Sequence, residues 1–212
     1  SIIKNTKKGE NNIFFTLYLN MIIVTSLKDH LDVCETTQPS HLISVIDPGF
    51  EPPTPKGILN HLSLGFDDII KISQNNLIHR NENLLEKNTF TNQILPNNEH
   101  IGKIVNFVES WDMSKPIVIH CWCGVSRSMA VATFIICKIN PSNIDQNIKY
   151  IRSLAPHANP NKLMLSLFEK ELGIDGKIIE SYKKYPYTKK YDCSTNFAPI
   201  TIFNINEISL TS

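Results

Sequence analysis

Hydrophobic residues form short runs along this chain, separated by stretches of mixed polarity. Four runs are apolar enough for buried strands, at 21–26, 41–46, 61–66 and 117–119. Other stretches carry apolar residues three or four positions apart, as in helices that bury one face. They cover 27–37, 97–111, 128–137, 142–154, 160–172 and 176–182. Strands that alternate with helices predict an α/β fold, with a central, mostly parallel sheet of about four to five strands flanked by helices.

Capping and turn residues mark several of these boundaries. Asn97 or Asn98 is placed to cap the helix that carries Trp111, and Ser142 to cap a later one. Gly173 is typical of a residue that ends a helix. In sheets of this kind, ligands bind beyond the carboxyl ends of the strands. We therefore look for chemistry just after each strand.

The chain divides into three parts by composition. Residues 1–20 are an N-terminal extension, 21–185 a single domain and 186–212 an unpatterned C-terminal tail. The extension has lysines before an apolar run, as a signal peptide does, but Asn20 interrupts it and no small-residue cleavage site follows. Within the domain, the Asn-rich segment 71–96 is either an irregular loop with one short helix or an insertion over the site, and we take it as a candidate specificity lid.

Charge and cysteine content exclude some classes of function. The net charge is +1, so no general attraction to nucleic acid or to a membrane is expected. The interleaved tyrosines and lysines of 182–191 could bind an anionic polymer, but such a run is more often solvated or packed on the domain. Five cysteines without regular spacing argue against a disulfide framework and for a reducing, cytoplasmic location. No cofactor or metal is expected, because the residues near Cys123 offer no second pair of zinc ligands.

The most informative stretch is 116–132. A buried strand ends at His120 and Cys121, a loop containing Gly124 follows, and Arg127 begins a helix. Backbone N–H groups converge on such a loop, and the helix dipole adds positive charge, so the geometry predicts an anion site. The same field favours a cysteine thiolate. The guanidinium of Arg127 can hold a phosphate with two parallel hydrogen bonds.

The motif His120-Cys121-x-x-Gly124-x-x-Arg127-Ser128 resembles the active-site signature of the cysteine-based protein tyrosine phosphatase superfamily. The segment 151–161 resembles the Arg-x-x-Arg-Pro-x-x-x-Pro-Asn segment of dual-specificity-like phosphatases, with Ala155 in place of the second arginine. The resemblance spans about 21–172 and is nearest to small bacterial phosphatases of this type.

This resemblance implies a role for each residue of the motif. Cys121 is the expected nucleophile of a two-step hydrolysis through a cysteinyl-phosphate. Ser128 is expected to donate a hydrogen bond to the thiolate, and His120 to order the loop without transferring protons. The phosphate oxygens are expected to be held by the Arg127 side chain and by the backbone amides of Trp122, Cys123, Gly124, Val125, Ser126 and Arg127.

The leaving group needs a general acid from a neighbouring loop. The resemblance implies an aspartate after the strand at 61–66, and we expect Asp68 in this role, with Asp67 second and Asp47 third. Both aspartates at 67 and 68 could instead only cap the loop. A separate hypothesis concerns Cys123, which could form a reversible disulfide with Cys121, with Cys34 or with Cys137.

The expected activity is phosphomonoester hydrolysis, most simply by a protein-tyrosine or dual-specificity phosphatase. Positions 122–126 contain no lysine, which favours phosphorylated proteins or small phosphomonoesters over phosphoinositides as substrates. One alternative is a non-catalytic phosphate-binding module. A second is a sulfur-transfer enzyme of the rhodanese type, which also uses a loop cysteine. Oligomeric state does not follow from the sequence.

Overall fold

The computed structural model describes residues 20–72, 93–191, 193, 194 and 196–209. The predicted N-terminal extension, apart from its last residue, and most of the predicted specificity lid at 71–96 lie outside these residues.

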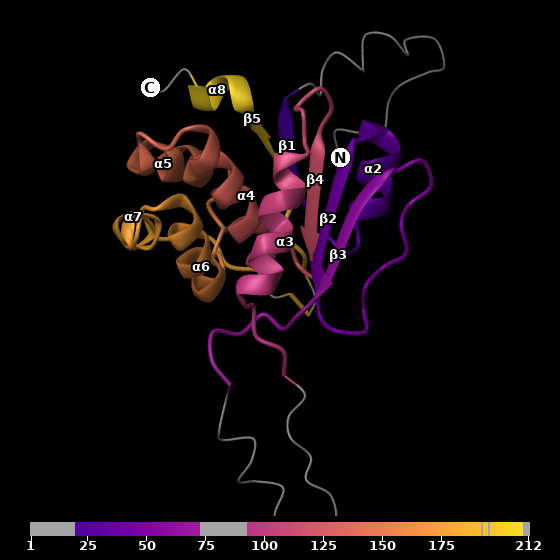
Figure 1. Ribbon diagram of the computed structural model, residues 1–212, viewed down its shortest axis with the longest axis horizontal. Helices are drawn as coiled ribbons and strands as arrows, with labels where there is room; N and C mark the ends of the chain where they lie inside the picture. Colours follow the sequence, from indigo (N-terminus) through magenta and orange to yellow (C-terminus); the bar gives the residue numbers. More distant parts are fainter. Residues whose placement is uncertain (1–19, 73–92, 192, 195, 210–212) are drawn as a thin grey trace, which may run out of the picture.

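The described chain folds around one five-stranded sheet (Figure 1). The strands, in chain order, are β1 (Met21–Ser26), β2 (His41–Ile46), β3 (Asn60–Gly65), β4 (Ile117–Cys121) and β5 (Thr201–Asn204). Across the sheet the order is β3-β2-β4-β1-β5, and all neighbours are parallel except β5, which is antiparallel to β1. The predicted α/β class and its mostly parallel sheet are confirmed.

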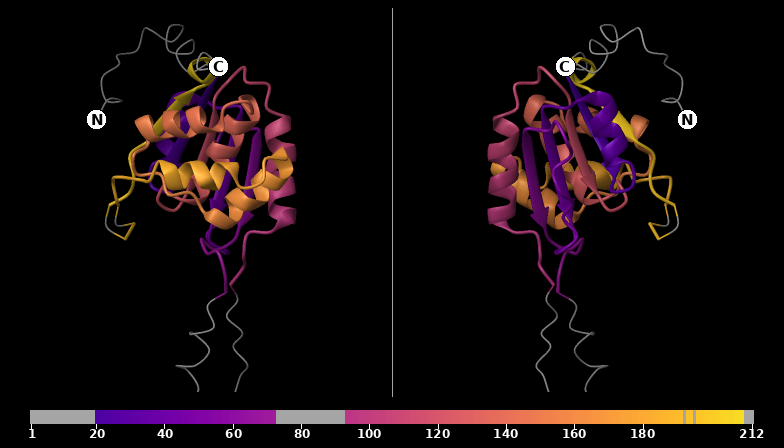
Figure 2. Two further views of the ribbon diagram at one scale, coloured as in Figure 1. Left: turned by 90° about the vertical axis from the view of Figure 1, so that its left-hand side faces the viewer. Right: turned by 90° about the vertical axis from the view of Figure 1, so that its right-hand side faces the viewer.

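Helices cover both faces of the sheet (Figure 2). One face holds α2 (His30–Thr37). The other holds α3 (Asn98–Glu109), α4 (Arg127–Ile139), α5 (Ile144–Leu154), α6 (Lys162–Leu172) and α7 (Lys177–Lys184), and α8 (Ile205–Ser209) follows β5. Alternate strand residues supply the two cores: Ile22 and Val24 face the larger layer, and Ile23 faces α2. Among the described residues, no helix has the length and apolar character needed to cross a membrane.

The predicted helix ends are met to within a few residues. Asn97 caps α3 by accepting the N–H of His100 at 3.1 Å. The cap of α5 is Asn143, one residue later than the predicted Ser142. Gly173 ends α6 with a φ of +66°, a backbone conformation that glycine adopts without a steric penalty. Local capping chemistry therefore sets these boundaries.

The C-terminal residues are not the unpatterned tail that the sequence suggested. β5 forms the edge of the sheet beside β1, with Ile22 opposite Phe203. Both Phe203 and Ile208 are buried. The folded domain therefore extends to α8. An alternation of only four residues in β5 is too short to be recognised without its partner strand.

Candidate active site

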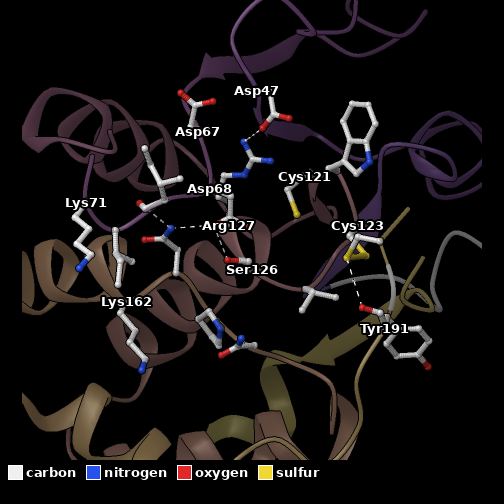
Figure 3. Close-up of a pocket in the computed structure, with 18 residues that line it drawn as sticks. Asp47, Asp67, Asp68, Lys71, Cys121, Cys123, Ser126, Arg127, Lys162 and Tyr191 are labelled. Carbon is white, nitrogen blue, oxygen red and sulfur yellow. Dashed lines mark hydrogen bonds and ion pairs between the residues drawn. A yellow bond between two sulfur atoms is a disulfide. The ribbon is translucent and has the colours of Figure 1, made fainter. Parts of the chain in front are cut away.

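The phosphate-binding loop predicted from the sequence lies at the carboxyl end of the sheet. β4 ends at Cys121 and α4 begins at Arg127, so residues 122–126 form a loop at a helix N-terminus. This loop is the floor of a pocket of about 890 Å³ (Figure 3). The pocket is lined by Asp47, Asp67, Asp68, Ile69, Ile70, Lys71, Cys121, Trp122, Cys123, Val125, Ser126, Arg127, Asn159, Pro160, Asn161, Lys162, Tyr191 and Cys193.

The carbonyl groups of the loop are hydrogen-bonded outward. Three N–H donors from three different segments bind them: Leu27 N to Trp122 O (3.2 Å), Ala198 N to Cys123 O (3.1 Å) and Asn159 N to Val125 O (3.0 Å). Carbonyls fixed on the outside of a tight loop leave its N–H groups to converge on the inside, which is the arrangement that binds anions. None of the three donors could be identified from the sequence.

Gly124 is required by the path of the loop. Its φ of +79° lies in the left-handed region. A Cβ at this position would also lie 3.3 Å from both the carbonyl carbon and the oxygen of Thr25. The glycine of the motif therefore has a conformational reason and a packing reason.

Cys121 lies at the floor of the pocket and is almost fully buried. Its Sγ is 3.1 Å from the Oγ of Ser128 and accepts the N–H of Gly124 at 3.3 Å. A hydroxyl and a backbone amide thus both lie within hydrogen-bonding distance of the sulfur. The geometry brings Cys121 and Ser128 together as the motif predicted.

Arg127 is held by two groups that the sequence did not connect to it. Its Nη1 forms an ion pair with Asp47 Oδ1 at 2.6 Å and donates to Phe66 O at 2.6 Å. The side chain is only 3% exposed, and its Nε has no partner among the described residues. Asp47, which was the third candidate for the general acid, is the ion-pair partner of Arg127 (Figure 3).

Asp68 lies in the same pocket, on the loop after β3. Its Oδ1 accepts the hydroxyl of Ser126 at 2.7 Å and the side-chain amide of Asn161 at 2.8 Å. The carbonyl oxygen of the same Asn161 amide caps α6, by accepting two backbone N–H groups at 3.0 Å. The Asn161 side chain thus ties the Asp68 loop to the N-terminus of α6.

Asp67 is occupied in a different way. Its carboxylate accepts the N–H of Ile94 at 2.6 Å, and its own N–H donates to Ile94 O at 2.8 Å. These bonds join the two described ends of the segment around 71–96. Asp67 therefore has the loop-capping contacts that we considered for both aspartates.

His120 is completely buried beneath the loop. Its Nε2 is hydrogen-bonded to Ser44 Oγ at 2.6 Å, and its ring stacks on His30 at 4.4 Å. Burial, and next the positive charge of a protonated His30, lower the pKa of His120 to about 3. The imidazole is therefore neutral at physiological pH, in agreement with a structural role.

Arg152 stabilises the segment 151–161, the second stretch that resembles dual-specificity-like phosphatases. Its guanidinium donates to Ala158 O and, at 2.7 Å, to Tyr185 O. Ala155 is completely buried at the position where the resemblance implies a second arginine. The segment is thus held by hydrogen bonds from the Arg152 side chain to backbone carbonyls.

Cys123 forms a disulfide with Cys193. Cys34, Cys121 and Cys137 are free. Cys123 is therefore in a disulfide, as hypothesised, but the three partners suggested for it are wrong. The two cysteines are 70 residues apart, and sequence spacing alone carries no sign of such a pairing. In the part of the chain that the structure describes, no three His, Cys, Asp or Glu side chains cluster as metal ligands.

Comparison with known proteins agrees with this geometry. Dual specificity protein phosphatase YVH1 of Plasmodium falciparum is 34% identical over 86 residues, which are 39% of this chain and 14% of that protein. Putative tyrosine-protein phosphatase R622 of Acanthamoeba polyphaga mimivirus is 34% identical over 89 residues, 39% of this chain and 41% of that protein. The chain thus spans less than half the length of these relatives. They come from a eukaryote and a virus, so the predicted likeness to bacterial phosphatases is not supported.

A solved structure and a family match extend the comparison. The crystal structure of human tyrosine phosphatase-like serine/threonine/tyrosine-interacting protein has a TM-score of 0.50 and 16% identity, over 72% of this chain and 91% of that one. At this identity the likeness shows the fold alone. The family described as "Dual specificity phosphatase, catalytic domain" matches residues 63–172, just over half of the chain, including both motifs and Asp68. With the Cys121 loop at the carboxyl end of a parallel sheet, this match shows that the chain belongs to the dual specificity phosphatase family.

Proposed function

We propose that this protein is an active phosphatase that hydrolyses phosphotyrosine and similar phosphomonoesters through a cysteinyl-phosphate. The observation that carries the proposal is the position of Cys121. Its sulfur lies between the Ser128 hydroxyl and the Gly124 amide, in the same pocket as Arg127 and Asp68. A nucleophile, an anion-binding loop and a candidate acid thus share one cavity.

In the first step, the Cys121 thiolate attacks phosphorus and the ester P–O bond breaks. Charge develops on the leaving oxygen, and Asp68 protonates it. Both hydrogen bonds to Asp68 are made at Oδ1, so we assign the transferred proton to Oδ2. The loop amides, together with Nε and the second terminal nitrogen of Arg127, hold the three phosphoryl oxygens.

In the second step, water attacks the phosphorus of the cysteinyl-phosphate. Asp68, now a carboxylate, accepts a proton from that water, and the S–P bond breaks to release inorganic phosphate. The Ser128 hydroxyl, 3.1 Å from sulfur, donates to the departing thiolate. Neutral His120 takes no part in these proton transfers, because its pKa is about 3.

Two features support phosphorylated proteins as the substrate class. The loop side chains at 122–126 include no lysine. A loop that binds a highly charged phosphoinositide headgroup would be expected to contain one. The relatives from Plasmodium falciparum and the mimivirus bear names that describe protein phosphatases.

The test is hydrolysis of para-nitrophenyl phosphate by the full chain, in the presence of dithiothreitol to keep Cys121 reduced. We expect Cys121→Ser to lose activity and Arg127→Lys to lose about 100- to 1,000-fold in kcat, because an ammonium cannot form two parallel bonds. If Cys121→Ser retains wild-type activity, the mechanism is wrong. A wild type that binds inorganic phosphate but hydrolyses nothing would identify a non-catalytic module.

A second assay tests the acid. Asp68→Asn keeps the shape of the side chain but carries no acidic proton. The variant should lower kcat by about 100-fold or more for phenyl phosphate, whose phenolate is a poor leaving group. For para-nitrophenyl phosphate, whose leaving group needs little protonation, the loss should be much smaller. Asp67→Asn is the matched control, and a larger leaving-group dependence in that variant would move the acid to Asp67.

A further inference from the structure

We propose that residues 186–199 form a specificity wall of the active-site pocket, and that the Cys123–Cys193 disulfide fixes this wall against the phosphate-binding loop. We call these residues the C-terminal strap; positions 192 and 195 within it lie outside the described residues. The inference rests on the proposed function, because it concerns which phosphate esters the same pocket accepts. It adds a redox-sensitive element that lies outside the region matched by the family.

The strap crosses the active-site end of the sheet. It leaves α7, passes the segment 156–159 and then the phosphate-binding loop, and enters β5. Its backbone binds both segments: the N–H groups of Thr188 and Lys189 donate to Pro156 O at 2.9 and 3.3 Å. The N–H of Ala198 donates to Cys123 O at 3.1 Å.

Two strap residues reach the substrate cavity. Tyr191 and Cys193 both line the pocket that contains Cys121 (Figure 3). The Tyr191 ring packs edge-on against His157, with centroids 5.3 Å apart and planes at 87°. His157 is buried and provides a fixed support for this ring. The strap thus places Tyr191 at the side of the pocket where Cys123 lies.

Besides the disulfide, backbone hydrogen bonds and the ring contact of Tyr191 hold the strap, but few of its side chains are buried. Among its described residues only Ala198 is buried, and Lys189 and Lys190 are exposed. A segment with few buried apolar contacts detaches at low free-energy cost unless it is covalently tied. The Cys123–Cys193 bond supplies that tie, and it attaches the strap to a residue of the phosphate-binding loop itself.

The covalent step is an ordinary thiol–disulfide exchange. A thiolate of added dithiothreitol attacks a sulfur of the disulfide, the S–S bond breaks, and a second thiol of the reductant completes the exchange. Two electrons pass to the protein, whose Cys123 and Cys193 become thiols, and the reductant becomes a cyclic disulfide. Glutathione disulfide reverses the reaction. The half-exposed Cys193 is the sulfur that we expect the thiolate to reach, because Cys123 is buried.

A wall beyond the phosphate affects only substrates that extend past it. A phosphotyrosine peptide fills the pocket up to Tyr191, whereas para-nitrophenyl phosphate engages mainly the floor. Binding energy from parts of the substrate away from phosphorus is realised in kcat/KM. Loss of one aromatic contact corresponds to a decrease in kcat/KM of about tenfold or less. We expect detachment of the strap to lower kcat/KM for the peptide by about this factor, with the small ester changed less than about twofold.

The experiment compares wild type, Cys193→Ser and Tyr191→Ala on both substrates, with and without dithiothreitol. The disulfide is checked by peptide mapping under non-reducing conditions. Without reductant, Cys193→Ser should show a lower ratio of kcat/KM for the peptide to kcat/KM for the small ester than wild type does. With reductant, the ratio of wild type should fall to that of Cys193→Ser. Tyr191→Ala should show the same ratio while its disulfide stays intact. Cys34→Ala, which alters a cysteine outside the disulfide, is the matched control and should still respond to reductant.

The outcomes separate this inference from the proposed function. A wild type that does not hydrolyse para-nitrophenyl phosphate in reductant refutes the proposed function. A different result is an active wild type with the same peptide-to-ester ratio of kcat/KM before and after reduction. If that ratio also equals the ratio of Cys193→Ser, the strap is not a specificity wall. Tryptic cleavage after Lys189 or Lys190 gives a readout without turnover: it should be faster in Cys193→Ser than in unreduced wild type. Equal rates also overturn the inference.

Discussion

The buried imidazole of His120 leads to a quantitative prediction about acid stability. The ring has no exposed surface, shares a hydrogen bond with Ser44 and stacks on His30. Burial and the charge of protonated His30, with smaller contributions from His61 and Arg127, lower its pKa from an ordinary 6.5 to about 3. The folded protein therefore resists protonation at a position that the unfolded chain protonates readily.

The free energy of unfolding decreases as the pH decreases, because the unfolded state binds a proton at His120 more readily than the folded state does. Above pH 6.5 His120 is neutral in both states, and its full contribution to stability is present. As the pH falls below 6.5 the unfolded state gains a proton that the folded state does not, so the free energy of unfolding decreases. Between pH 7.5 and 5 the loss is about 2 kcal/mol, and it approaches about 5 kcal/mol near pH 3, where the folded state also protonates.

The assay is urea unfolding at pH 7.5 and pH 5, followed by the fluorescence of Trp111 and Trp122. Other histidines add to the acid sensitivity of wild type; burial lowers the pKa of His157, for example, to about 4. The comparison with His120→Gln isolates one ring, since glutamine retains a hydrogen-bonding group for Ser44 and does not titrate. We expect the variant to lose about 2 kcal/mol less than wild type between the two pH values. An identical loss in both proteins would refute the lowered pKa.

Three further substitutions test contacts around the pocket. Gly124→Ala should lower the free energy of unfolding by about 1–2 kcal/mol in urea, because its φ of +79° is strained for alanine, and should abolish turnover. Asp47→Asn should lower kcat/KM for para-nitrophenyl phosphate by about tenfold, since an amide holds the Arg127 guanidinium less firmly than a carboxylate; an unchanged value would show that Phe66 O alone suffices. Asn161→Ala should cost about 1 kcal/mol of stability as a lost cap and reduce the rate more for phenyl phosphate than for the para-nitro ester, because Asp68 loses its tether.

Much of the catalytic loop was predictable because its structure is local. The apolar run before Cys121, the Gly124 position and the helix formers after Arg127 are neighbours in sequence, and each one restricts the backbone independently of distant residues. The cap at Asn97 follows the same logic. Asp67 and Asp68 could not be distinguished from the sequence, because two adjacent aspartates have the same local context and differ only in their distant partners.

The errors have a common physical origin. The ion pair between Asp47 and Arg127 joins the residue after β2 to the first residue of α4. The Cys123–Cys193 bond joins residues 70 positions apart, and β5 becomes a strand only beside β1. None of these contacts leaves a periodic signal in the chain. Predictions that lie at 1–19 and 73–92 fall on residues that the structure does not describe.

The sequence by itself therefore determined the strand, loop and helix that carry Cys121 and Arg127, because a fixed five-residue spacing and local backbone preferences suffice to build an anion-binding loop. The tertiary structure decided what surrounds that loop. Asp47 fixes the arginine, Asn161 holds Asp68 over the pocket, and the C-terminal strap is bonded to Cys123. Each of these pairs is distant in sequence, and only the folding of the sheet brings its two members within bonding distance.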